Sequence, residues 1–575
     1  MRAGVALAAG PALGVTARLA CGPAGAGLGA DAAWAVGLAV WMAAWWINAA
    51  APLAVTALLP LVVLPLAGVG GMAENARAYS SPVIGLFMGG FMLQAAVERW
   101  GLHRRVALGV LLLAGPSPRA QVGGVIASTA LLSMWMSNAA AAALMMPIGA
   151  SIVAAARGRA GAGVGVGAGV GPGAGAGGSG VDAAGPATPQ AQARAANFQA
   201  CVLLGVAFGA SIGGMGTPVG TPPNALVIGQ LREAHSVDVS FLAWALYAVP
   251  IMLALLGLTW AVLCLWLHPV GRSASGGGDG GDGGGRGQTR AAWRALGPLS
   301  AAQWGVVGCV GLAVVGWLAG PALAHAVGMT SPGPGGAPRP RITDEGVALT
   351  AAVLLFVIPA RWPSPTGEPV PTRLLTWEQA QSIPWGVLVL FGGGLSLADA
   401  MDRTGVTAAL GEQLGALRGA PPLVVLLVVG AAVSLVSNVM SNTALTAAMA
   451  PVVSAGAVGL GMEPAALLAP LALFASTCFV LPSGTPPNAV VFSSGRLSIS
   501  QLARAGGVLA PLAVAVIALM TWLMPPGVAS RAWPAPLGAP GAAPNAPGAL
   551  PSAPRSGSIP AGPLRAGAGA SDGVL

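Results

Sequence analysis

Two short polar motifs occur twice in this sequence, each time inside an apolar stretch. The first is Ser137-Asn138, repeated as Ser441-Asn442, and the second is Gly220-Thr221-Pro222-Pro223-Asn224, repeated as Gly484-Thr485-Pro486-Pro487-Asn488. Hydroxyl and amide oxygens coordinate hard cations, and hydroxyl and amide hydrogens bind carboxylates. Proline bars a regular helix, and glycine lets a backbone carbonyl approach an ion. These residue types predict reversible binding of a cation such as sodium together with an anion.

The two copies keep a constant spacing along the chain. Ser441 follows Ser137 by 304 residues, and the same offset relates Ser133 to Ser437 and Leu86-Phe87-Met88-Gly89-Gly90 to Leu390-Phe391-Gly392-Gly393-Gly394. The pentads lie 264 residues apart, and a Gly/Ala-rich stretch present only in the first half (residues 157–195) accounts for the missing 40 residues. We therefore predict two structural repeats that meet at one central site.

Composition places these motifs in a membrane. The 575 residues are 55% hydrophobic and 7% charged, with a mean hydropathy of +0.76, whereas about a quarter of the residues of a soluble protein are charged. The apolar runs are long and continuous, which predicts helices rather than the alternating strands of a barrel. We expect an all-α polytopic membrane protein with about 10–11 transmembrane helices. Its two repeats are expected to be inverted, each with a re-entrant hairpin and a broken helix.

The apolar runs and the polar stretches between them predict the domain organisation. It comprises a poorly defined N-terminal segment (1–31), a first transmembrane repeat (32–269) that contains the Gly/Ala-rich linker (157–195), a polar linker (270–300), a second transmembrane repeat (301–525) and a disordered Pro/Ala/Gly-rich tail (526–575). An odd number of membrane crossings in each repeat would invert the second copy relative to the first.

The charge and the cysteines exclude several classes of function. The net charge of +9 comes from arginines, many of them in loops between apolar runs, which suits retention on the cytoplasmic side of a membrane and not nucleic-acid binding. The cysteines lack metal-ligand spacing and are interpreted as free thiols that act as small apolar residues: Cys21, Cys201, Cys264, Cys309 and Cys478. No cluster of catalytic side chains surrounds the duplicated motifs, so the sequence does not predict an enzyme.

No arginine adjoins any of the four motifs. An anion bound there would depend on amides, hydroxyls, helix dipoles and a bound cation, which would supply the main full positive charge. Cation and anion would then support each other's binding, and this mutual support is the thermodynamic basis of symport.

The motifs and their flanks resemble the divalent anion/sodium symporter family, the sodium-coupled dicarboxylate, citrate and sulfate carriers. The resemblance covers roughly residues 32–525. It rests on an early stretch with Trp41-Met42, Trp45-Trp46-Ile47, Pro52 and Val55-Thr56-Ala57-Leu58-Leu59-Pro60, and on a late stretch with Ala475-Ser476-Thr477-Cys478-Phe479, Pro482, Gly484 and Asn488-Ala489-Val490-Val491. It implies a multi-pass carrier of the plasma or inner membrane that works as a homodimer by an elevator movement.

The resemblance also implies the site residues. One sodium site would use Ser133, Ser137, Asn138 and the Gly220 carbonyl, and the other Ser437, Asn442 and the Gly484 carbonyl. The anion would lie between Ser137-Asn138, Ser441-Asn442-Thr443, Thr221-Pro222 and Thr485-Pro486. Sodium would act as the coupling ion, and no enzymatic cofactor is expected.

Three positions depart from the family pattern. Ala139 stands where a threonine is usual, so the first motif lacks a hydroxyl that Thr443 keeps in the second. Asn48-Ala49-Ala50 replaces a segment with a glutamate, and Ser483 replaces an aliphatic residue. The alternatives to symport of a C4-dicarboxylate are an anion exchanger, a carrier of sulfate or another inorganic anion on the same fold, and a membrane receptor that does not transport.

Overall fold

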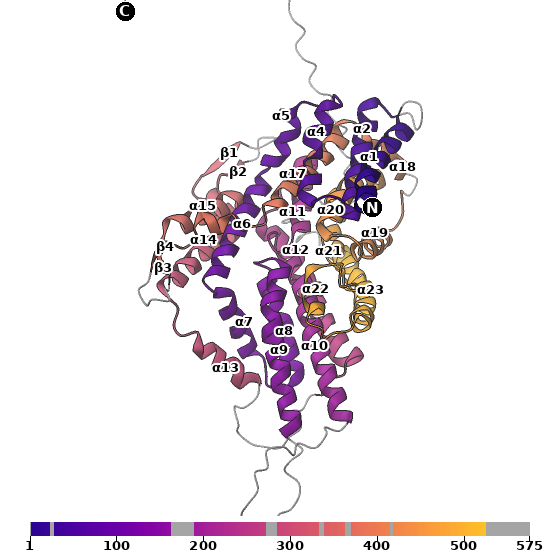
Figure 1. Ribbon diagram of the computed structural model, residues 1–575. Helices are drawn as coiled ribbons and strands as arrows, with labels where there is room; N and C mark the ends of the chain where they lie inside the picture. Colours follow the sequence, from indigo (N-terminus) through magenta and orange to yellow (C-terminus); the bar gives the residue numbers. More distant parts are fainter. Residues whose placement is uncertain are drawn as a thin grey trace, which may run out of the picture. The chain divides into compact units, whose positions relative to one another are not determined.

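The computed structural model describes residues 2–22, 28–162, 189–271, 285–332, 338–362, 370–414 and 418–524. The C-terminal tail predicted for residues 526–575 and most of the Gly/Ala-rich linker therefore lie outside the described residues. All the elements described below belong to one compact unit, Met1–Leu537. Figure 1 labels them along the chain.

The elements of the first half are almost all helices. In chain order they are α1 (Arg2–Cys21), α2 (Ala30–Asn48), α3 (Leu53–Thr56), α4 (Leu59–Leu66), α5 (Met72–Ala76), η1 (Arg77–Ser80), α6 (Pro82–Arg99), α7 (Leu102–Leu113), α8 (Pro118–Ser133), α9 (Asn138–Ala162), α10 (Pro189–Gly213), η2 (Gly214–Gly216), α11 (Pro222–His235), α12 (Phe241–Ala261) and the π-helical η3 (Val262–Leu267).

The second half adds two short β-hairpins. Its elements are α13 (Gly285–Ala295), α14 (Ala301–Ala326), β1 (Thr330–Pro332), β2 (Pro338–Pro340), α15 (Asp344–Val357), β3 (Pro359–Trp362), β4 (Val370–Arg373), α16 (Trp377–Ala380), α17 (Trp385–Arg403), α18 (Val406–Leu414), α19 (Pro422–Ser437), α20 (Asn442–Leu460), α21 (Pro464–Ala475), α22 (Pro486–Ser493) and α23 (Ile499–Leu523). Both strand pairs are antiparallel, with Thr330 opposite Pro340 and Pro359 opposite Arg373.

The described residues include nine helices that are long and apolar enough to cross a membrane. The count rises to ten if the bent pair Met72–Ser80 and Pro82–Arg99, with a 41° bend, forms one span. The sequence predicts 10–11 spans, and the structure reaches ten only when the bent pair is counted as one span. One candidate span, Gly4–Cys21, lies in the N-terminal segment for which the sequence defined no element.

Two linkers are shorter than their predicted bounds. Helix α9 continues to Ala162 and α10 begins at Pro189, so both enter the stretch predicted as a flexible Gly/Ala-rich linker. Helix α13 lies within the predicted polar linker and packs against α7. The composition does not reveal where these helices end. Alanine and arginine favour helices, but they are also common in low-complexity linkers.

The repeat seen in the sequence is also a repeat of local structure. Gly101 follows α6 and Gly405 follows α17, and both have positive φ angles, of 68° and 79°. A Cβ at Gly89 of α6 would lie 2.6 Å from the Ala348 carbonyl carbon, and one at Gly393 of α17 would lie under 3.0 Å from the Ala57 carbonyl oxygen. Equivalent glycines therefore permit close helix contacts in both halves.

Replacing Gly89 with leucine is expected to lower the stability of the detergent-purified protein by about 1–3 kcal/mol, because α6 and α15 would have to separate. The melting temperature, determined by heating samples and measuring the folded peak that remains on size-exclusion chromatography, would report the loss of stability. The matched control is Gly308→Leu on α14, where a Cβ meets nothing within 4 Å. Equal melting temperatures for the two variants would contradict the close contact.

Each half contains a pair of helices joined by a short polar break, followed by a helix interrupted at the pentad. The pairs are α8–α9 and α19–α20, and the interrupted helices are α10–η2–α11 and α21–α22. Proline stands in the first turn of α8, α11, α19, α21 and α22, where its missing N–H and fixed φ are tolerated. At α11 and α22 these prolines restart a helix immediately after the pentad break.

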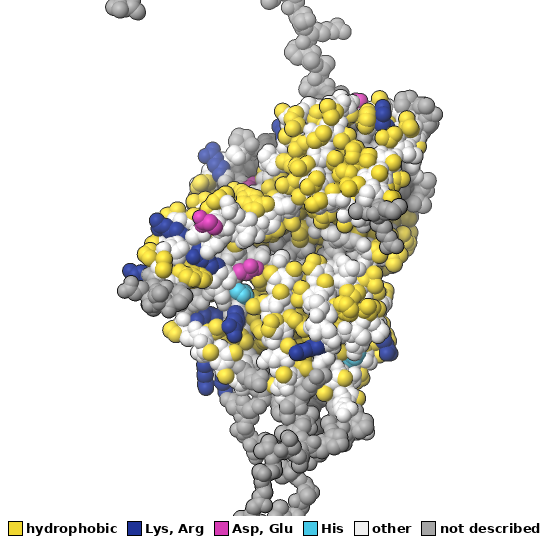
Figure 2. Space-filling view, in the orientation of Figure 1, with side chains coloured by type: hydrophobic (Ala, Val, Ile, Leu, Met, Phe, Trp, Pro, Cys, Tyr) yellow, Lys and Arg dark blue, Asp and Glu magenta, His cyan; other side chains and the backbone are white. Residues whose placement is uncertain are grey.

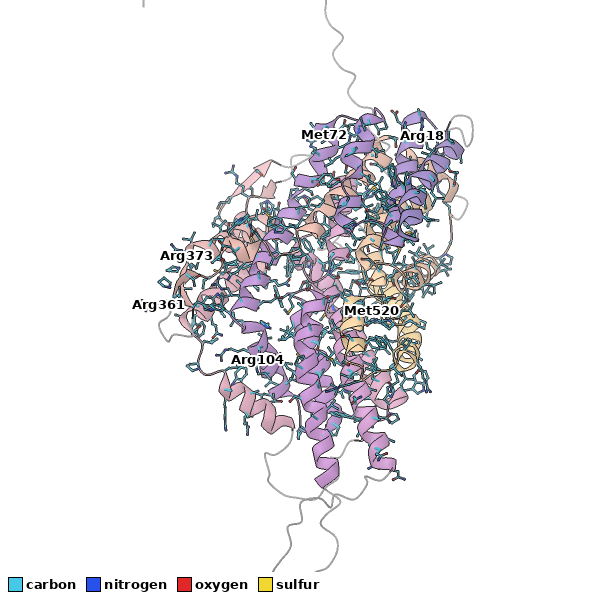
Figure 3. The ribbon with its side chains drawn as sticks, in the orientation of Figure 1. Arg18, Met72, Arg104, Arg361, Arg373 and Met520 are labelled. Atoms are coloured by element: carbon cyan, nitrogen blue, oxygen red, sulfur yellow. The ribbon has the colours of Figure 1, made fainter. Side chains whose placement is uncertain are left out.

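The outer surface is strongly apolar. Figure 2 shows hydrophobic side chains covering the face formed by α1 and α2, where Val5 and Leu19 are exposed. Arginines lie mostly toward the left and lower parts of the same view, where Figure 3 labels Arg104, Arg361 and Arg373, although Arg18 lies on α1 itself. A broad exposed apolar surface with few charged side chains suits contact with lipid.

Candidate functional site

The first candidate site forms where the α8–α9 break meets the α10–α11 break. The Ser133 hydroxyl lies 2.7 Å from Asn138 Oδ1 and 2.6 Å from the Ala210 carbonyl oxygen, so its single proton serves one of them at a time. A Cβ at Gly214 would lie under 3.0 Å from Asn138 Oδ1, and a Cβ at Gly220 would lie 3.0 Å from the Ser133 carbonyl oxygen. The structure therefore brings Ser133, Asn138 and Gly220 together around Gly214.

A buried asparagine holds the open backbone of this break. Asn224 is 0% exposed, and its Nδ2 donates to the carbonyl oxygens of Gly214 (3.0 Å), Met215 (3.4 Å) and Thr217 (2.7 Å). The Thr217 hydroxyl donates to the Met134 carbonyl oxygen at 2.5 Å, which ties the α10–α11 loop to the α8–α9 break. These bonds satisfy carbonyls that a regular helix would have paired internally.

The second candidate site has a different set of contacts. Asn442 Oδ1 accepts a hydrogen bond from Cys478 Sγ at 3.1 Å, while the Ser437 hydroxyl donates to the Ser434 carbonyl oxygen at 2.9 Å. A Cβ at Gly484 would lie 3.4 Å from the Cys478 Cβ and 3.2 Å from the Asn438 carbonyl oxygen. Asn442 and Gly484 thus meet through Cys478, whereas Ser437 is directed to its own helix.

The second break has its own asparagine clamp. Asn488 is 1% exposed, and its Nδ2 donates to the carbonyl oxygens of Cys478 and Leu481, both at 3.0 Å. Asn224 and Asn488 occupy the same pentad position and bond to equivalent loop residues. Among the described residues the Oδ1 atoms of both asparagines are buried without a hydrogen-bond partner.

The remaining predicted site residues lie at helix N-termini. Ser137 precedes α9 and its hydroxyl accepts from the Ala140 amide at 3.3 Å, while Ser441 is the N-cap residue of α20 and makes no side-chain cap bond. Thr221 and Thr485 are the N-cap residues of α11 and α22, each 3% exposed, and Pro222, Pro486 and Thr443 fall in the first turns. Four helices therefore begin at the duplicated motifs, and helix N-termini favour anions.

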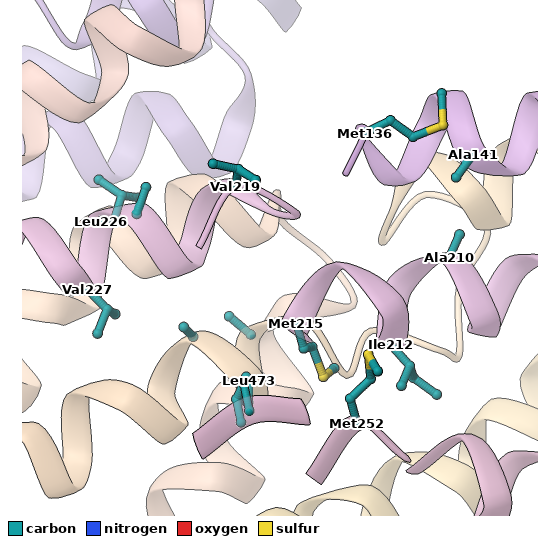
Figure 4. Packing of buried hydrophobic residues seen from close by; sticks show 14 of the residues in the cluster. Met136, Ala141, Ala210, Ile212, Met215, Val219, Leu226, Val227, Met252 and Leu473 are labelled. Atoms are coloured by element: carbon teal, nitrogen blue, oxygen red, sulfur yellow. The ribbon is translucent and has the colours of Figure 1, made fainter. Parts of the chain in front are cut away.

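The two repeats interlock around the breaks. Helix α11 packs against α20 and α21 of the second half, and α22 packs against α9 and α10 of the first. The Phe208 and Phe479 rings meet at 5.0 Å between centroids. Figure 4 shows the apolar packing around the first break, where Met215 of η2 lies close to Met252 of α12. The clamp asparagines Asn224 and Asn488 are buried at this interface, whereas Ser137, Asn138 and Asn442 are partly exposed and Ser441 is exposed.

Three stacked aromatic rings hold the tip of the first hairpin. Trp135 lies between α8 and α9 and stacks on Phe241 at 5.9 Å, and Phe241 stacks on Trp317 of α14 at 4.5 Å with 8° between the ring planes. The Trp317 indole N–H also donates to the Asp344 carbonyl oxygen at 2.9 Å. The equivalent of Trp135 in the second half is Val439, which is 70% exposed.

Trp317→Ala is expected to cost on the order of 3 kcal/mol of stability, because it empties a fully packed ring site beside the hairpin tip. Thermal unfolding in detergent would measure the loss, and Trp317→Phe should recover part of it by restoring a stacked ring. Trp304→Ala on the same helix is the control, because Trp304 is 60% exposed. A Trp317→Ala variant as stable as this control would contradict the role of the stack.

Cys478, Gly214, Asn224 and Asn488 contribute to the sites although the sequence did not single out their contacts. The interpretation of Cys478 as a small apolar residue misses its hydrogen bond to Asn442. One signal in the sequence could have found it, because the pentad offset of 264 pairs Cys478 with Gly214 in the first break. The described residues contain no group of three or more His, Cys, Asp or Glu side chains that could hold a metal ion.

Comparison with known proteins identifies the family. A family model described as the sodium:sulfate symporter transmembrane region matches residues 11–527. The chain belongs to this family. It is therefore a multi-pass membrane transporter of the sodium-coupled dicarboxylate and sulfate symporter family and not an enzyme, as the resemblance of the duplicated motifs predicted.

Curated relatives in this family extend over most of the chain. The sodium-dependent dicarboxylate transporter SdcS of Staphylococcus saprophyticus is 33% identical over 493 residues, covering 85% of this chain and 86% of the relative. SdcS of Staphylococcus aureus strain USA300 is 33% identical over 491 residues and 85% of each chain. Membership of the family implies sodium coupling for this chain. The dicarboxylate in the names of these relatives is the substrate of those proteins.

Solved transporter structures share the fold. The YdaH transporter of Alcanivorax borkumensis superimposes with a TM-score of 0.50 at 17% identity, over 78% of this chain and 86% of that one. MtrF of Neisseria gonorrhoeae gives the same TM-score at 12% identity, over 83% and 87%. These similarities support a polytopic helical transporter architecture.

Proposed function

We propose that this family member couples the entry of sodium to the uptake of a small divalent anion such as a C4-dicarboxylate. The observation that carries the proposal is the duplicated arrangement of the breaks. In each repeat an asparagine of a Ser-Asn motif contacts the loop that precedes a Thr-Pro-Pro-Asn helix start. Such breaks are tolerated in a membrane where they are enclosed by protein and line a site.

The proposed cation ligands are oxygens. In the first repeat they come from Ser133, Ser137, Asn138 and the Gly220 carbonyl, and the approach of Ser133, Asn138 and Gly220 to one another supports this set. In the second repeat they come from Ser437, Asn442 and the Gly484 carbonyl. The contacts of Asn442 and Gly484 with Cys478 support those two residues, whereas Ser437 would have to turn away from the Ser434 carbonyl.

The proposed anion site lies between the four helix N-termini at the motifs. Hydroxyls and N–H groups of Ser137-Asn138, Ser441-Asn442-Thr443, Thr221 and Thr485 would bind the anion. Pro222 and Pro486, which have no N–H to donate, would line the site, and the sodium ions would offset the anion's charge. Dependence of each ion on the other would couple their movement. The further parts of the proposal are the inverted relation of the two repeats, the domain division at residues 270–300, an elevator movement and a homodimer.

Uptake into proteoliposomes tests the proposal directly. Radiolabelled succinate, malate, citrate and sulfate would each be supplied outside, with and without an inward sodium gradient. Sodium-dependent accumulation of one of them is expected. Absence of sodium- or proton-driven uptake of all four would overturn it, and uptake driven only by an internal anion would show exchange instead.

A sulfate or other inorganic anion carrier is the second candidate, and Ala139 favours it. The first motif lacks the hydroxyl that Thr443 provides in the second, so the first half offers fewer donors to a carboxylate. Sulfate is shorter than a C4-dicarboxylate, so donors placed mainly in the second half could still reach all of it. Competition of unlabelled sulfate against labelled succinate would rank the two substrates.

A further inference from the structure

The pentad register pairs Cys478 of the second break with Gly214 of the first. In the first repeat the backbone of Gly214 lies so close to Asn138 that any Cβ would fall under 3.0 Å from Asn138 Oδ1. In the second repeat a thiol occupies the equivalent position, and Cys478 Sγ donates to Asn442 Oδ1 at 3.1 Å. The side chain of Cys478 is fully buried.

The two asparagines therefore receive different donors. Asn138 Oδ1 lies 2.7 Å from the Ser133 hydroxyl, whereas the equivalent Ser437 donates to its own helix and leaves Asn442 Oδ1 to the thiol. The thiol is held in place because the Cys478 carbonyl accepts from Asn488 Nδ2 at 3.0 Å. The buried Oδ1 of Asn488 has no partner in the described part of the chain, which leaves a further oxygen near the Cys478 backbone for a ligand.

A hydroxyl and a thiol act differently beside a hard cation. When a cation binds the amide oxygen, a serine hydroxyl can rotate its proton away and offer its own oxygen as a ligand. Sulfur of a protonated thiol is a soft, weak acceptor and gives sodium little in return. The S–H group of Cys478 thus competes with a cation for Asn442 Oδ1. Its sulfur does not supply a cation ligand equivalent to the Ser133 hydroxyl oxygen of the first site.

We propose that Cys478 is a specificity-determining residue of the second cation site and makes that site the weaker of the two for sodium. The inference rests on the proposed function, because it takes Asn442 as a sodium ligand. It assigns the two repeats unequal roles: the first site fills at lower sodium concentration, and the second sets the concentration at which coupling is complete.

Sodium-dependent thermal stabilisation of the full-length purified protein tests the proposal, because a ligand that binds the folded state raises the melting temperature. Cys478→Ser should lower the half-saturating sodium concentration at least threefold. Cys478→Ala, which removes the competing donor without adding a ligand, should lower it less. Cys309→Ser on α14 is the matched control and should leave the value unchanged. Melting without sodium shows that each variant is folded.

Combining Cys478→Ser with a substitution that disables either cation site shows at which site Cys478 acts. Cys478→Ser should still lower the half-saturating concentration when Asn138→Ala disables the first site, and should have no effect beside Asn442→Ala. Sodium stabilisation of the native protein with unchanged values in both Cys478 variants would overturn the inference and leave the proposed function standing. Absence of both sodium stabilisation and sodium-driven uptake in the native protein would overturn the two together.

Discussion

Replacing either Asn138 or Asn442 with alanine is expected to reduce sodium-driven uptake by at least about 100-fold while leaving a folded protein. Each amide oxygen lies at the break of its own hairpin, against the loop that precedes a pentad helix. Loss of residues that only support a metal ligand costs roughly 10–100-fold in affinity or activity, so loss of a direct ligand should reach at least the upper end of that range.

Initial rates in proteoliposomes would measure the loss, and size-exclusion profiles would confirm folding. Asn48→Ala is the matched control, because Asn48 ends α2 and its amide donates to the Ala44 carbonyl in the same helix. Near-normal uptake by either motif variant would contradict the assignment of that half-site. A loss in one variant alone would show that a single repeat binds the coupling ion.

Gly214→Ala should also strongly reduce uptake, for a steric reason. The added Cβ would lie under 3.0 Å from Asn138 Oδ1 and 3.1 Å from Asn138 Cγ, and the break is held rigidly because Asn224 binds the Gly214 carbonyl. Asn138 would have to leave the Ser133 hydroxyl. We expect at least about a 30-fold lower rate, because misplacing a ligand by roughly an ångström has an effect of order 100-fold.

The same uptake assay measures this variant beside Gly257→Ala on α12, where a Cβ meets nothing within 4 Å. Sodium titration of Gly214→Ala separates a lost cation site from a folding defect, because the second site should still stabilise the protein. A rate equal to that of Gly257→Ala would show that Asn138 can move without consequence.

Much of the architecture follows from the spacing of residues. The offset of 304 predicts that α6 and α17 are equivalent, and Gly101 and Gly405 then end both helices with positive φ. A constant register reveals such features because the same local sequence forms the same local structure twice. The resemblance to the family implied that Ser133, Asn138 and Gly220 share one site, and the structure places them close together, while their role as sodium ligands stays a prediction.

The sequence was less informative where the copies differ. It could not show that Ser437 bonds to the Ser434 carbonyl, which is a choice of side-chain rotamer within α19, or that Cys478 contacts Asn442, which joins the segment after α21 to the start of α20. The stack of Trp135, Phe241 and Trp317 joins three segments far apart in the chain, which no local pattern indicates. The ends of α9 and α10 were hidden by the composition of the residues between them.

The interlocking of the pentad helices has a consequence for biogenesis. Residues 223–231 of α11 are all buried, and the helices that cover them, α20 and α21, begin more than 200 residues later in the chain. At a synthesis rate of about 5–20 residues per second, α11 emerges at least roughly ten seconds before its partners. During that interval its polar break must be shielded by the insertion machinery or by a chaperone. The first half of the protein therefore reaches its final packing only after the second half has been made.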